Sequence, residues 1–205
     1  MFARATTIQA RPGSIDDGIA FCRDEVLPLI QDIDGCIGLS MIVDRESGRC
    51  IATSAWETEA AMRASDEQLS SIRERAGEIL GASPQVEEWE IGGLHRDHRT
   101  AEGACSRVSW MAGEPGQTDR LVEVFRNIMP TLESWDGFCS ASLLLNRETG
   151  RCVITTTWDS RAALEQSRPL ADQTRAQAAD DSGTSISEVA EFELALAHLR
   201  VPELV

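Results

Sequence analysis

The chain has 205 residues and a formal net charge of −15, with 19 cations, all of them arginines, against 34 acidic residues. This acidity argues against nucleic acid or an anionic membrane as a partner, because both attract clustered cationic side chains. The six cysteines show no C-x-x-C spacing, and neither a signal peptide nor an apolar run of about 18 residues is visible, so we expect reduced thiols in a cytoplasmic protein without a membrane span.

Hydrophobic periodicity predicts six elements in the first half of the chain. A strand over residues 2–10 comes first. The helix after it begins at the N-cap Ser14 and ends at Gly35, and Pro28 should kink its last turn. An antiparallel hairpin, a second helix and an acidic strand complete the half. These four elements are a strand over 37–43, a strand over 50–56, a helix that is capped by Thr58 and stops at Gly81, and a strand over 86–91.

The second half of the chain repeats the first. Asp44–Cys50 (DRESGRC) returns as Asn146–Cys152 (NRETGRC) 102 residues later, and Trp56 returns as Trp158 at the same offset. A repeat of this length is a whole small domain rather than a solenoid unit. We therefore predict a first domain over 1–92, a linker over 93–102 and a second domain with a C-terminal tail over 103–205.

The order β-α-β-β-α-β within each half is that of a ferredoxin-like unit of the α+β class. In such a unit two helices cover one face of the sheet and leave the other face bare and apolar. We expect the bare faces of the two tandem repeats to cover each other, so that the chain packs as an intramolecular dimeric α+β barrel. A cavity between the sheets is then the natural ligand site. Further self-association of this internal dimer stays open.

Two stretches that follow the hairpins carry a family resemblance. Trp56–Met62 (WETEAAM) and Trp158–Leu164 (WDSRAAL) resemble the W-[DE]-[ST]-x-x-A-[LM] stretch of antibiotic biosynthesis monooxygenase-like (ABM) proteins, which belong to the dimeric α+β barrel superfamily. The resemblance spans both halves, about 90 residues each. It implies a protein that acts on or binds a small molecule, because the family contains cofactor-free oxygenases of aromatic polyketides, quinol oxygenases and haem-degrading oxygenases.

The side chains that this family uses for catalysis are missing at the matching positions. Cofactor-free members use an Asn four residues before the motif Trp, where this chain has Ala52 and Ile154, and they often carry a pocket Tyr, a residue type that the chain lacks. A frequent family His, nine residues after the Trp, is replaced by Ser65 and Ser167. Haem-degrading members bind iron through a His on the second helix, and neither second helix contains one. We therefore expect no cofactor and assign no catalytic residue.

Four residues are candidates for a ligand pocket: Trp56, Trp158, Ser65 and Ser167. The tryptophans stand at strand ends, where an indole can stack on a flat hydrophobic ligand, although core packing is the commoner role of such a residue. The serines stand at the positions of the family His.

Two further clusters carry weaker chemical signals. His95 and His98 lie three residues apart in the linker and could share a metal only on a helix with a third ligand nearby, so we interpret them as solvated and predict no metal site. The acidic run Glu87–Glu90 is echoed at Glu191–Glu193. One of these carboxylates could act as a general base, but a strand with a charged outer face is the simpler interpretation.

Three functional hypotheses follow. The first is a cofactor-free, monooxygenase-like enzyme that oxidises a flat hydrophobic substrate, with the substrate supplying electrons to dioxygen. The second is a non-catalytic ligand-binding or regulatory protein on the same scaffold, and the third is an interaction module. A cavity between sheet and helices with a polar group besides Trp favours the first, a cavity alone favours the second, and filled sheet faces favour the third.

Overall fold

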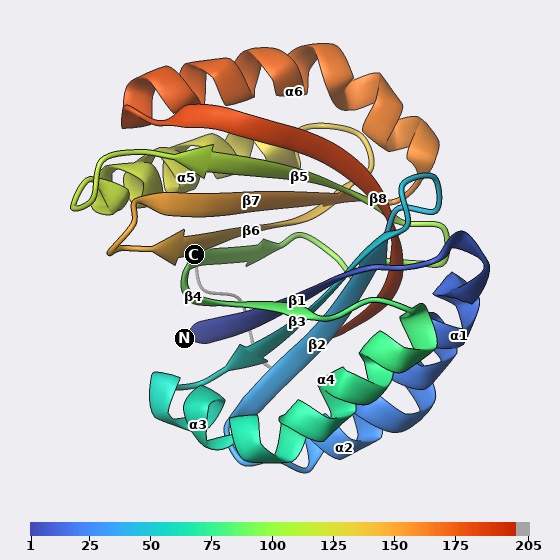
Figure 1. The fold of residues 1–205 in the computed structure, drawn as a ribbon. Coiled ribbons are helices and arrows are strands. Elements are labelled where there is room, and N and C mark those ends of the chain that lie inside the picture. The colour runs from blue at the N-terminus through green and yellow to red at the C-terminus, as the bar shows by residue number, and fades with distance from the viewer. Residues whose placement is uncertain (200–205) are drawn as a thin grey trace. The chain divides into compact units, whose positions relative to one another are not determined.

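The computed structural model of this chain describes residues 1–199 and divides into two compact units, each built from antiparallel strands and helices (Figure 1). Unit 1 comprises Met1–Trp89 and the strand segment that starts at Glu193, and unit 2 comprises Glu90–Phe192. The long strands β4 (Gln85–Arg96) and β8 (Ser185–Leu199) therefore each contribute residues to both units.

Unit 1 has the predicted order of strand, helix, two strands, helix and strand. Before β4 its elements are β1 (Phe2–Gln9), η1 (Pro12–Ser14), α1 (Ile15–Phe21), η2 (Cys22–Val26), α2 (Leu27–Gln31), β2 (Cys36–Val43), β3 (Arg49–Trp56), α3 (Glu59–Ala64) and α4 (Asp66–Leu80). β3 is the central strand, because it pairs with β1 on one side and with β2 on the other. β2 also pairs with the second half of β8, from Val43↔Glu193 to Gly38↔Leu199.

The predicted kink in the first helix takes the form of a π turn. The segments α1, η2 and α2 follow one another without a break, and η2 is the π-helical turn that stands before Pro28. A proline has no N–H group and its ring clashes with the carbonyl four residues earlier. The wider π turn, in which Leu27 donates to the Cys22 carbonyl, accommodates that clash without ending the helix.

Unit 2 repeats the same order with longer helices. Its elements after β4 are β5 (Cys105–Ala112), α5 (Thr118–Glu133), β6 (Phe138–Asn146), β7 (Arg151–Trp158), α6 (Arg161–Ser182) and the first half of β8. β7 lies between β5 and β6, and the second half of β4 pairs with β6 from Glu90↔Leu145 to Arg96↔Ser140. Thr58 caps α3 as predicted, and Ser160 at the offset of 102 caps α6 in the same way, since each accepts a hydrogen bond from the backbone. The predicted cap at Ser14 does not form, because its Oγ donates to the Arg11 and Leu80 carbonyls instead.

Followed from neighbour to neighbour, the hydrogen-bonded strands have the closed order β1-β3-β2-β8-β5-β7-β6-β4. The α+β class, the two ferredoxin-like repeats and the antiparallel eight-stranded barrel topology are thus confirmed. Each repeat extends its own three central strands with one half of β4 and one half of β8.

β4 and β8 are longer than the sequence predicts. Residues 93–96, predicted as linker, continue β4 and pair with β6. The repeat predicts the last strand over 189–194, whereas β8 spans Ser185–Leu199. The Gly92-Gly93 pair, which suggests a linker, has a packing reason instead. A Cβ on Gly93 would lie 2.5 Å from the Phe125 ring, so only glycine lets α5 approach the strand this closely. The rest of the expected tail, 200–205, lies outside the described residues.

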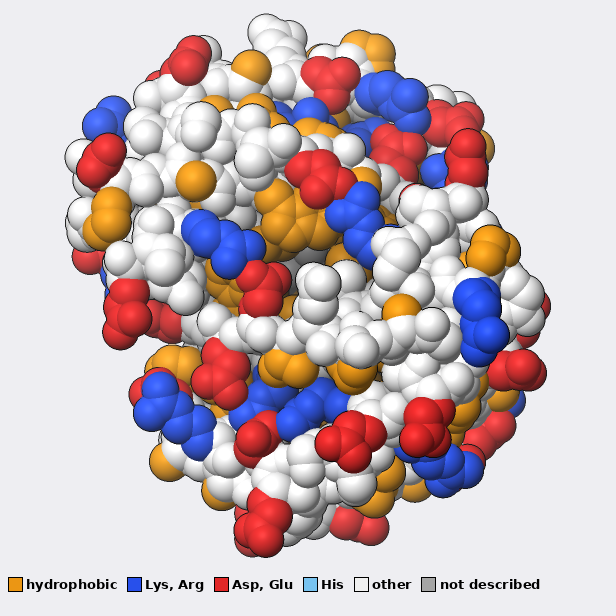
Figure 2. Space-filling model, in the orientation of Figure 1, with side chains coloured by type: hydrophobic (Ala, Val, Ile, Leu, Met, Phe, Trp, Pro, Cys, Tyr) orange, Lys and Arg blue, Asp and Glu red, His pale blue; other side chains and the backbone are white. Residues whose placement is uncertain are grey.

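Each unit has its own hydrophobic core. Trp56 is fully buried in the core of unit 1 and Trp158 in that of unit 2. Five of the six cysteines are buried free thiols, and Cys36 is half-buried. No helix among the described residues is long and apolar enough to cross a membrane. On the face drawn in Figure 2, acidic and arginine side chains are interspersed rather than gathered into a continuous basic patch.

Candidate functional site

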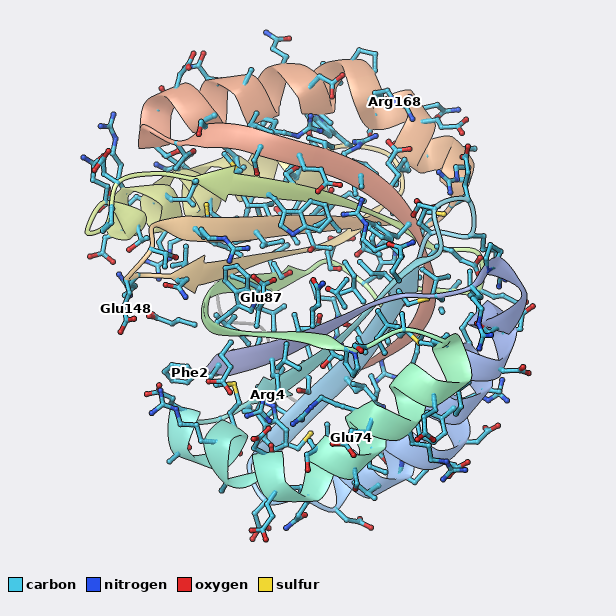
Figure 3. All side chains as sticks on the ribbon, in the orientation of Figure 1. Phe2, Arg4, Glu74, Glu87, Glu148 and Arg168 are labelled. Carbon is cyan, nitrogen blue, oxygen red and sulfur yellow. The ribbon has the colours of Figure 1, made fainter. Side chains whose placement is uncertain are left out.

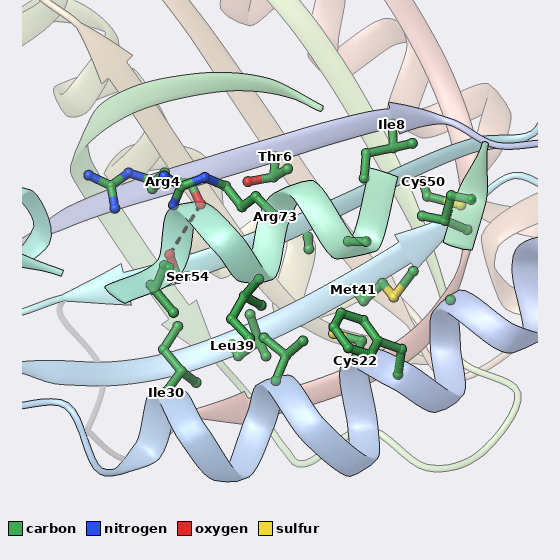
Figure 4. A pocket seen from close by; sticks show the side chains of 18 residues that line it. Arg4, Thr6, Ile8, Cys22, Ile30, Leu39, Met41, Cys50, Ser54 and Arg73 are labelled. Carbon is green, nitrogen blue, oxygen red and sulfur yellow. Dashed lines mark hydrogen bonds between the residues drawn. The ribbon is translucent and has the colours of Figure 1, made fainter. Parts of the chain in front are cut away.

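Unit 1 contains an apolar cavity of about 80 Å³ between its sheet and its helices. The alternation of β1 directs Arg4, Thr6 and Ile8 toward the helices, while α4 contributes Arg73 from the opposite wall (Figure 4). Most of the lining is apolar and includes Cys22, Ile30, Leu39, Met41, Cys50 and Leu69. The polar groups gather at one end, near Ser54, so a ligand would meet an apolar slot that is charged at one end (Figure 4).

Arg4 is the buried cation of this cavity. It is only 3% exposed, and Figure 3 shows it on the helix-facing side of the sheet of unit 1. Its Nη2 donates to Glu88 Oε1 at 2.8 Å, its Nε donates to the same oxygen at 3.2 Å, and its Nη1 donates to Ser65 Oγ at 3.1 Å. Ser65 in turn donates to the Met62 carbonyl at 2.7 Å, which fixes the hydroxyl so that a lone pair faces the guanidinium.

A second cation is close to the first. Arg73 forms an ion pair with Asp66, and the same Asp66 Oδ1 lies 3.6 Å from Arg4 Nη1. Asp66 and Glu88 are 58% and 40% exposed at their side chains, so water screens both anions, whereas Arg4 is shielded. The buried end of this charge cluster is therefore positive.

Unit 2 has a matching cavity of about 50 Å³ in the corresponding place. Arg107 is 3% exposed there and donates to Glu191 Oε1, Ser167 Oγ and the Leu164 carbonyl at 2.8 to 3.1 Å. Burial lowers the pKa of Arg107, and the hydrogen bonds and charge of Glu191 oppose that shift. An arginine in such a setting stays protonated, so the cavity keeps a fixed positive charge.

Corresponding positions of the two cavities match better in their polar residues than in their apolar ones. Arg107 follows Arg4 by 103 residues, and Arg175 follows Arg73 by 102. The apolar positions have changed chemistry at the same offsets, with Leu69 matched by Ala171, Ile72 by Thr174 and Ile8 by Met111. Each cavity therefore pairs a buried arginine on the first strand with an arginine on the second long helix.

The four residues predicted to line a pocket have different places in the structure. Trp158 lines the cavity of unit 2 and stacks on Trp135, with ring centroids 6.1 Å apart. Trp56 lies in the core beside the cavity of unit 1, and its Nε1 donates to Ser54 Oγ at 3.0 Å. Ser65 and Ser167 do not line the cavities; they hold the arginines that do.

Sequence reasoning missed the arginines and misplaced their partners. Glu88 and Glu191, interpreted as members of a charged outer face, form the ion pairs with Arg4 and Arg107 instead. One signal was available, since an arginine recurs within the first strand of both repeats. The offset there is 103 rather than 102, so a comparison at a single fixed offset does not align them.

The two linker histidines have unlike surroundings. His95 is not solvated: it is 6% exposed in β4, its ring stacks on Phe138 at 6.3 Å, and its Nε2 lies 2.8 Å from Glu133 Oε1. The extension of β4 past Gly93 is what buries it. His98 follows the strand and is exposed, with Asp97 Oδ2 at 2.7 Å from its Nδ1.

Comparison with known proteins settles the family. The antibiotic biosynthesis monooxygenase family matches residues 1–68 and 110–179, more than half of the chain. The chain belongs to this family. One of the two matched segments falls in each repeat, so the scaffold is that of a monooxygenase-like protein in tandem.

Related sequences and structures match this ABM protein along nearly its whole length. The uncharacterized protein Rv2557 of Mycobacterium tuberculosis (strain ATCC 25618 / H37Rv) is 53% identical over 206 residues, which cover 100% of this chain and 92% of the relative. A candidate monooxygenase from Lactobacillus acidophilus NCFM shares the fold with a TM-score of 0.72 at 9% identity, over 100% and 99% of the two chains. An anthrone oxidase-like protein does so with a TM-score of 0.67 at 13% identity, over 99% and 94%.

Proposed function

We propose that this ABM protein binds a flat, mostly apolar molecule in the cavity of each unit, and that the buried arginine anchors an oxygen atom of that molecule. The observation that carries the proposal is the duplicated site. An apolar slot ends at Arg4 in unit 1 and at Arg107 in unit 2, and both guanidinium groups are held in place by a serine and a glutamate.

The ligand chemistry follows from the lining. Apolar walls favour a hydrophobic ring system, because its transfer from water releases about 25 cal/mol for each Å² of apolar surface buried. A guanidinium in a water-poor cavity favours a carbonyl, an enolate or a phenolate oxygen. Glu88 and Ser65 take three of the five N–H groups of Arg4, which leaves donors for a ligand. A flat ketone or phenol fits both requirements.

Cofactor-free oxidation is the second candidate, and the fixed positive charge favours it. An anthrone-like substrate loses a ring CH₂ proton to give an enolate, which Arg4 or Arg107 would stabilise. The enolate can pass an electron to dioxygen, and the two radicals combine to a peroxide that releases water. The balance is one ketone with a CH₂ group plus O₂, giving one diketone plus H₂O. The described residues that line the cavities include no carboxylate or histidine, so the proton would pass to water and substrate acidity would limit the rate.

Anthrone is the probe that separates these functions. The expected result is saturable quenching of tryptophan fluorescence by anthrone in the wild-type protein, weakened at least about tenfold in Arg4→Met combined with Arg107→Met, since one charge-assisted hydrogen bond is worth about 1.5–3 kcal/mol. Arg63→Met is the control, because Arg63 is 66% exposed and its ion pair among the described residues is with Glu59 on its own helix. Equal affinity in all three proteins would refute the anchoring role.

An oxygen electrode then tests the enzymatic candidate. Anthrone with the wild-type protein should consume one O₂ for each anthraquinone formed, faster than anthrone alone and without added haem, flavin or metal. Binding without accelerated oxygen uptake would assign the ligand-binding or regulatory function instead. A haem titration is the matched comparison, and a new Soret band that survives gel filtration would contradict the expectation of a cofactor-free protein.

A further inference from the structure

Three side chains from separate segments of unit 2 converge, and none of them is among the residues that line its cavity. His98 follows β4, Cys139 is the second residue of β6, and Asp159 stands between β7 and α6. Backbone hydrogen bonds fix the three segments together. Asp97 N–H donates to the Cys139 carbonyl at 2.8 Å, and Asp159 N–H donates to the Gly137 carbonyl at 2.8 Å. The side chains are therefore placed by the sheet rather than by loose surface contacts.

The atoms that meet are one nitrogen, one sulfur and one oxygen. His98 Nε2 lies 2.9 Å from Asp159 Oδ1, and Cys139 Sγ donates to the same oxygen at 3.1 Å. All three atoms lie within 4.8 Å of one another. In a tetrahedral zinc site, bond lengths of about 2.0–2.3 Å place the ligand atoms about 3.3–3.7 Å apart. Small side-chain rotations are enough to reach that spacing.

A second carboxylate orients the imidazole. Asp97 Oδ2 lies 2.7 Å from His98 Nδ1, so Nδ1–H donates to Asp97, while Nε2 faces Asp159 Oδ1 and becomes a metal ligand by losing its own proton. Metal-bound histidines characteristically donate their other ring N–H to a carboxylate in this way. Asp97 therefore takes the position of the carboxylate that orients a metal-bound histidine.

We propose that His98 Nε2, Cys139 Sγ and Asp159 Oδ1 bind a divalent zinc ion, with the fourth position open to water. The mixed donor set suits zinc, which accepts imidazole, thiolate and carboxylate ligands. A thiolate and a carboxylate neutralise the two charges of the ion, so Cys139, which is 0% exposed, meets no net charge. His98 and Asp159 are 41% and 44% exposed, which leaves an entry path and room for the water. Binding breaks the Cys139 S–H bond and the His98 Nε2–H bond, and both protons leave to solvent.

The first repeat lacks these three donors, so no equivalent zinc site is expected in unit 1. At the offset of 102, Cys139 is matched by Ile37 and Asp159 by Glu57. The site is thus specific to unit 2, and none of its three donors lines either of the two arginine cavities.

Cobalt(II) is the probe, because a thiolate bound to this ion gives a near-ultraviolet charge-transfer band that exposed carboxylates do not produce. The wild-type protein should show the band with a stoichiometry of one ion per chain, and added zinc should abolish it. Cys139→Ser should remove the band entirely. His98→Ala and Asp159→Asn should each weaken zinc binding in calorimetric titration at least about tenfold, and Asp97→Asn about 10- to 100-fold.

Two variants serve as controls. Cys36→Ser removes a half-buried thiol of unit 1, and His198→Ala removes a histidine of β8; both should keep the band and the affinity. Circular dichroism checks the fold of every variant, and the exposed position of His98 keeps that variant informative if Cys139→Ser is unstable. A wild-type protein without a charge-transfer band, or a band that persists in Cys139→Ser, would overturn the proposal.

Discussion

Removal of Glu88 should destabilise the protein more than removal of Arg4, although the two form one ion pair. The pair is asymmetric, since the side chain of Arg4 is 3% exposed and that of Glu88 is 40% exposed. When Arg4 is replaced by methionine, water solvates the remaining carboxylate and the apolar side chain fills the vacated space. When Glu88 is replaced by alanine, a cation that cannot lose its proton stays buried without its main partner.

The magnitudes follow from this difference. Breaking a buried pair by removing one partner costs about 3–5 kcal/mol when the other charge is left buried. Ser65 still accepts from Arg4, and Asp66 remains 3.6 Å away, so we place the cost of Glu88→Ala at or just below the lower end of this range, at about 2–3 kcal/mol. Arg4→Met leaves an anion with access to water, and we expect about 1 kcal/mol or less.

Urea unfolding monitored by circular dichroism, with calorimetry to detect separate transitions of the two units, measures both costs. Glu59→Ala is the control, because its pair with Arg63 is exposed and should contribute less than about 0.5 kcal/mol. The double variant Arg4→Met with Glu88→Met should recover most of the loss, since apolar groups can replace a buried ion pair at little cost. If Arg4→Met costs as much as Glu88→Ala, the reasoning from burial is wrong.

Three further predictions concern packing and titration. In native protein at pH 8, Ellman's reagent should modify Cys36 fast and the buried thiols slowly, because burial raises the pKa of Cys22 to about 12; rapid release of more than one thiol per chain would contradict this. Gly93→Ala should cost about 1–3 kcal/mol in urea unfolding, because its Cβ would meet the Phe125 ring, and an unchanged midpoint would count against that contact. Burial raises the pKa of Asp44, but hydrogen bonds within its turn outweigh this and leave the pKa lowered, so its stabilisation is complete above the unfolded pKa of about 3.9 and is lost as the pH falls through the folded value. Asp44→Asn should flatten the stability profile below pH 4, and an identical acid profile would refute the assignment.

Local signals predicted the parts of the fold that depend on short stretches of chain. The turn Asp44–Gly48 and the cap Thr58 form as expected, because a hairpin turn and an N-cap are determined by the residues within them. The full length of β4 depends instead on β6, a partner about 50 residues away that provides hydrogen bonds for 93–96. The Gly-Gly sequence there suggests a linker. Glycine is required instead by the close packing of β4 against α5, which only the tertiary structure shows.

The candidate site was harder to predict for a related reason. Charged residues are rarely buried, so a rule that places them on the surface is usually right. It fails at Arg4 and Arg107, whose carboxylate partners lie 84 residues away along the chain. Ser65 and Ser167, which stand at the family His positions, accept hydrogen bonds from those arginines, a role that their sequence position alone does not suggest.

The buried arginines are not required by packing. A buried ion pair is often no more stabilising than apolar side chains of the same volume, so stability alone would let either repeat replace its pair with methionine or leucine. The apolar lining has in fact changed between the repeats, from Leu69 to Ala171 and from Ile72 to Thr174. Both units nevertheless hold a guanidinium, a glutamate and a serine in the same arrangement beside a cavity. A positive charge held where packing does not need it supports the proposal that the arginine anchors an oxygen atom of a ligand, and it makes the cavities the place to look for that ligand.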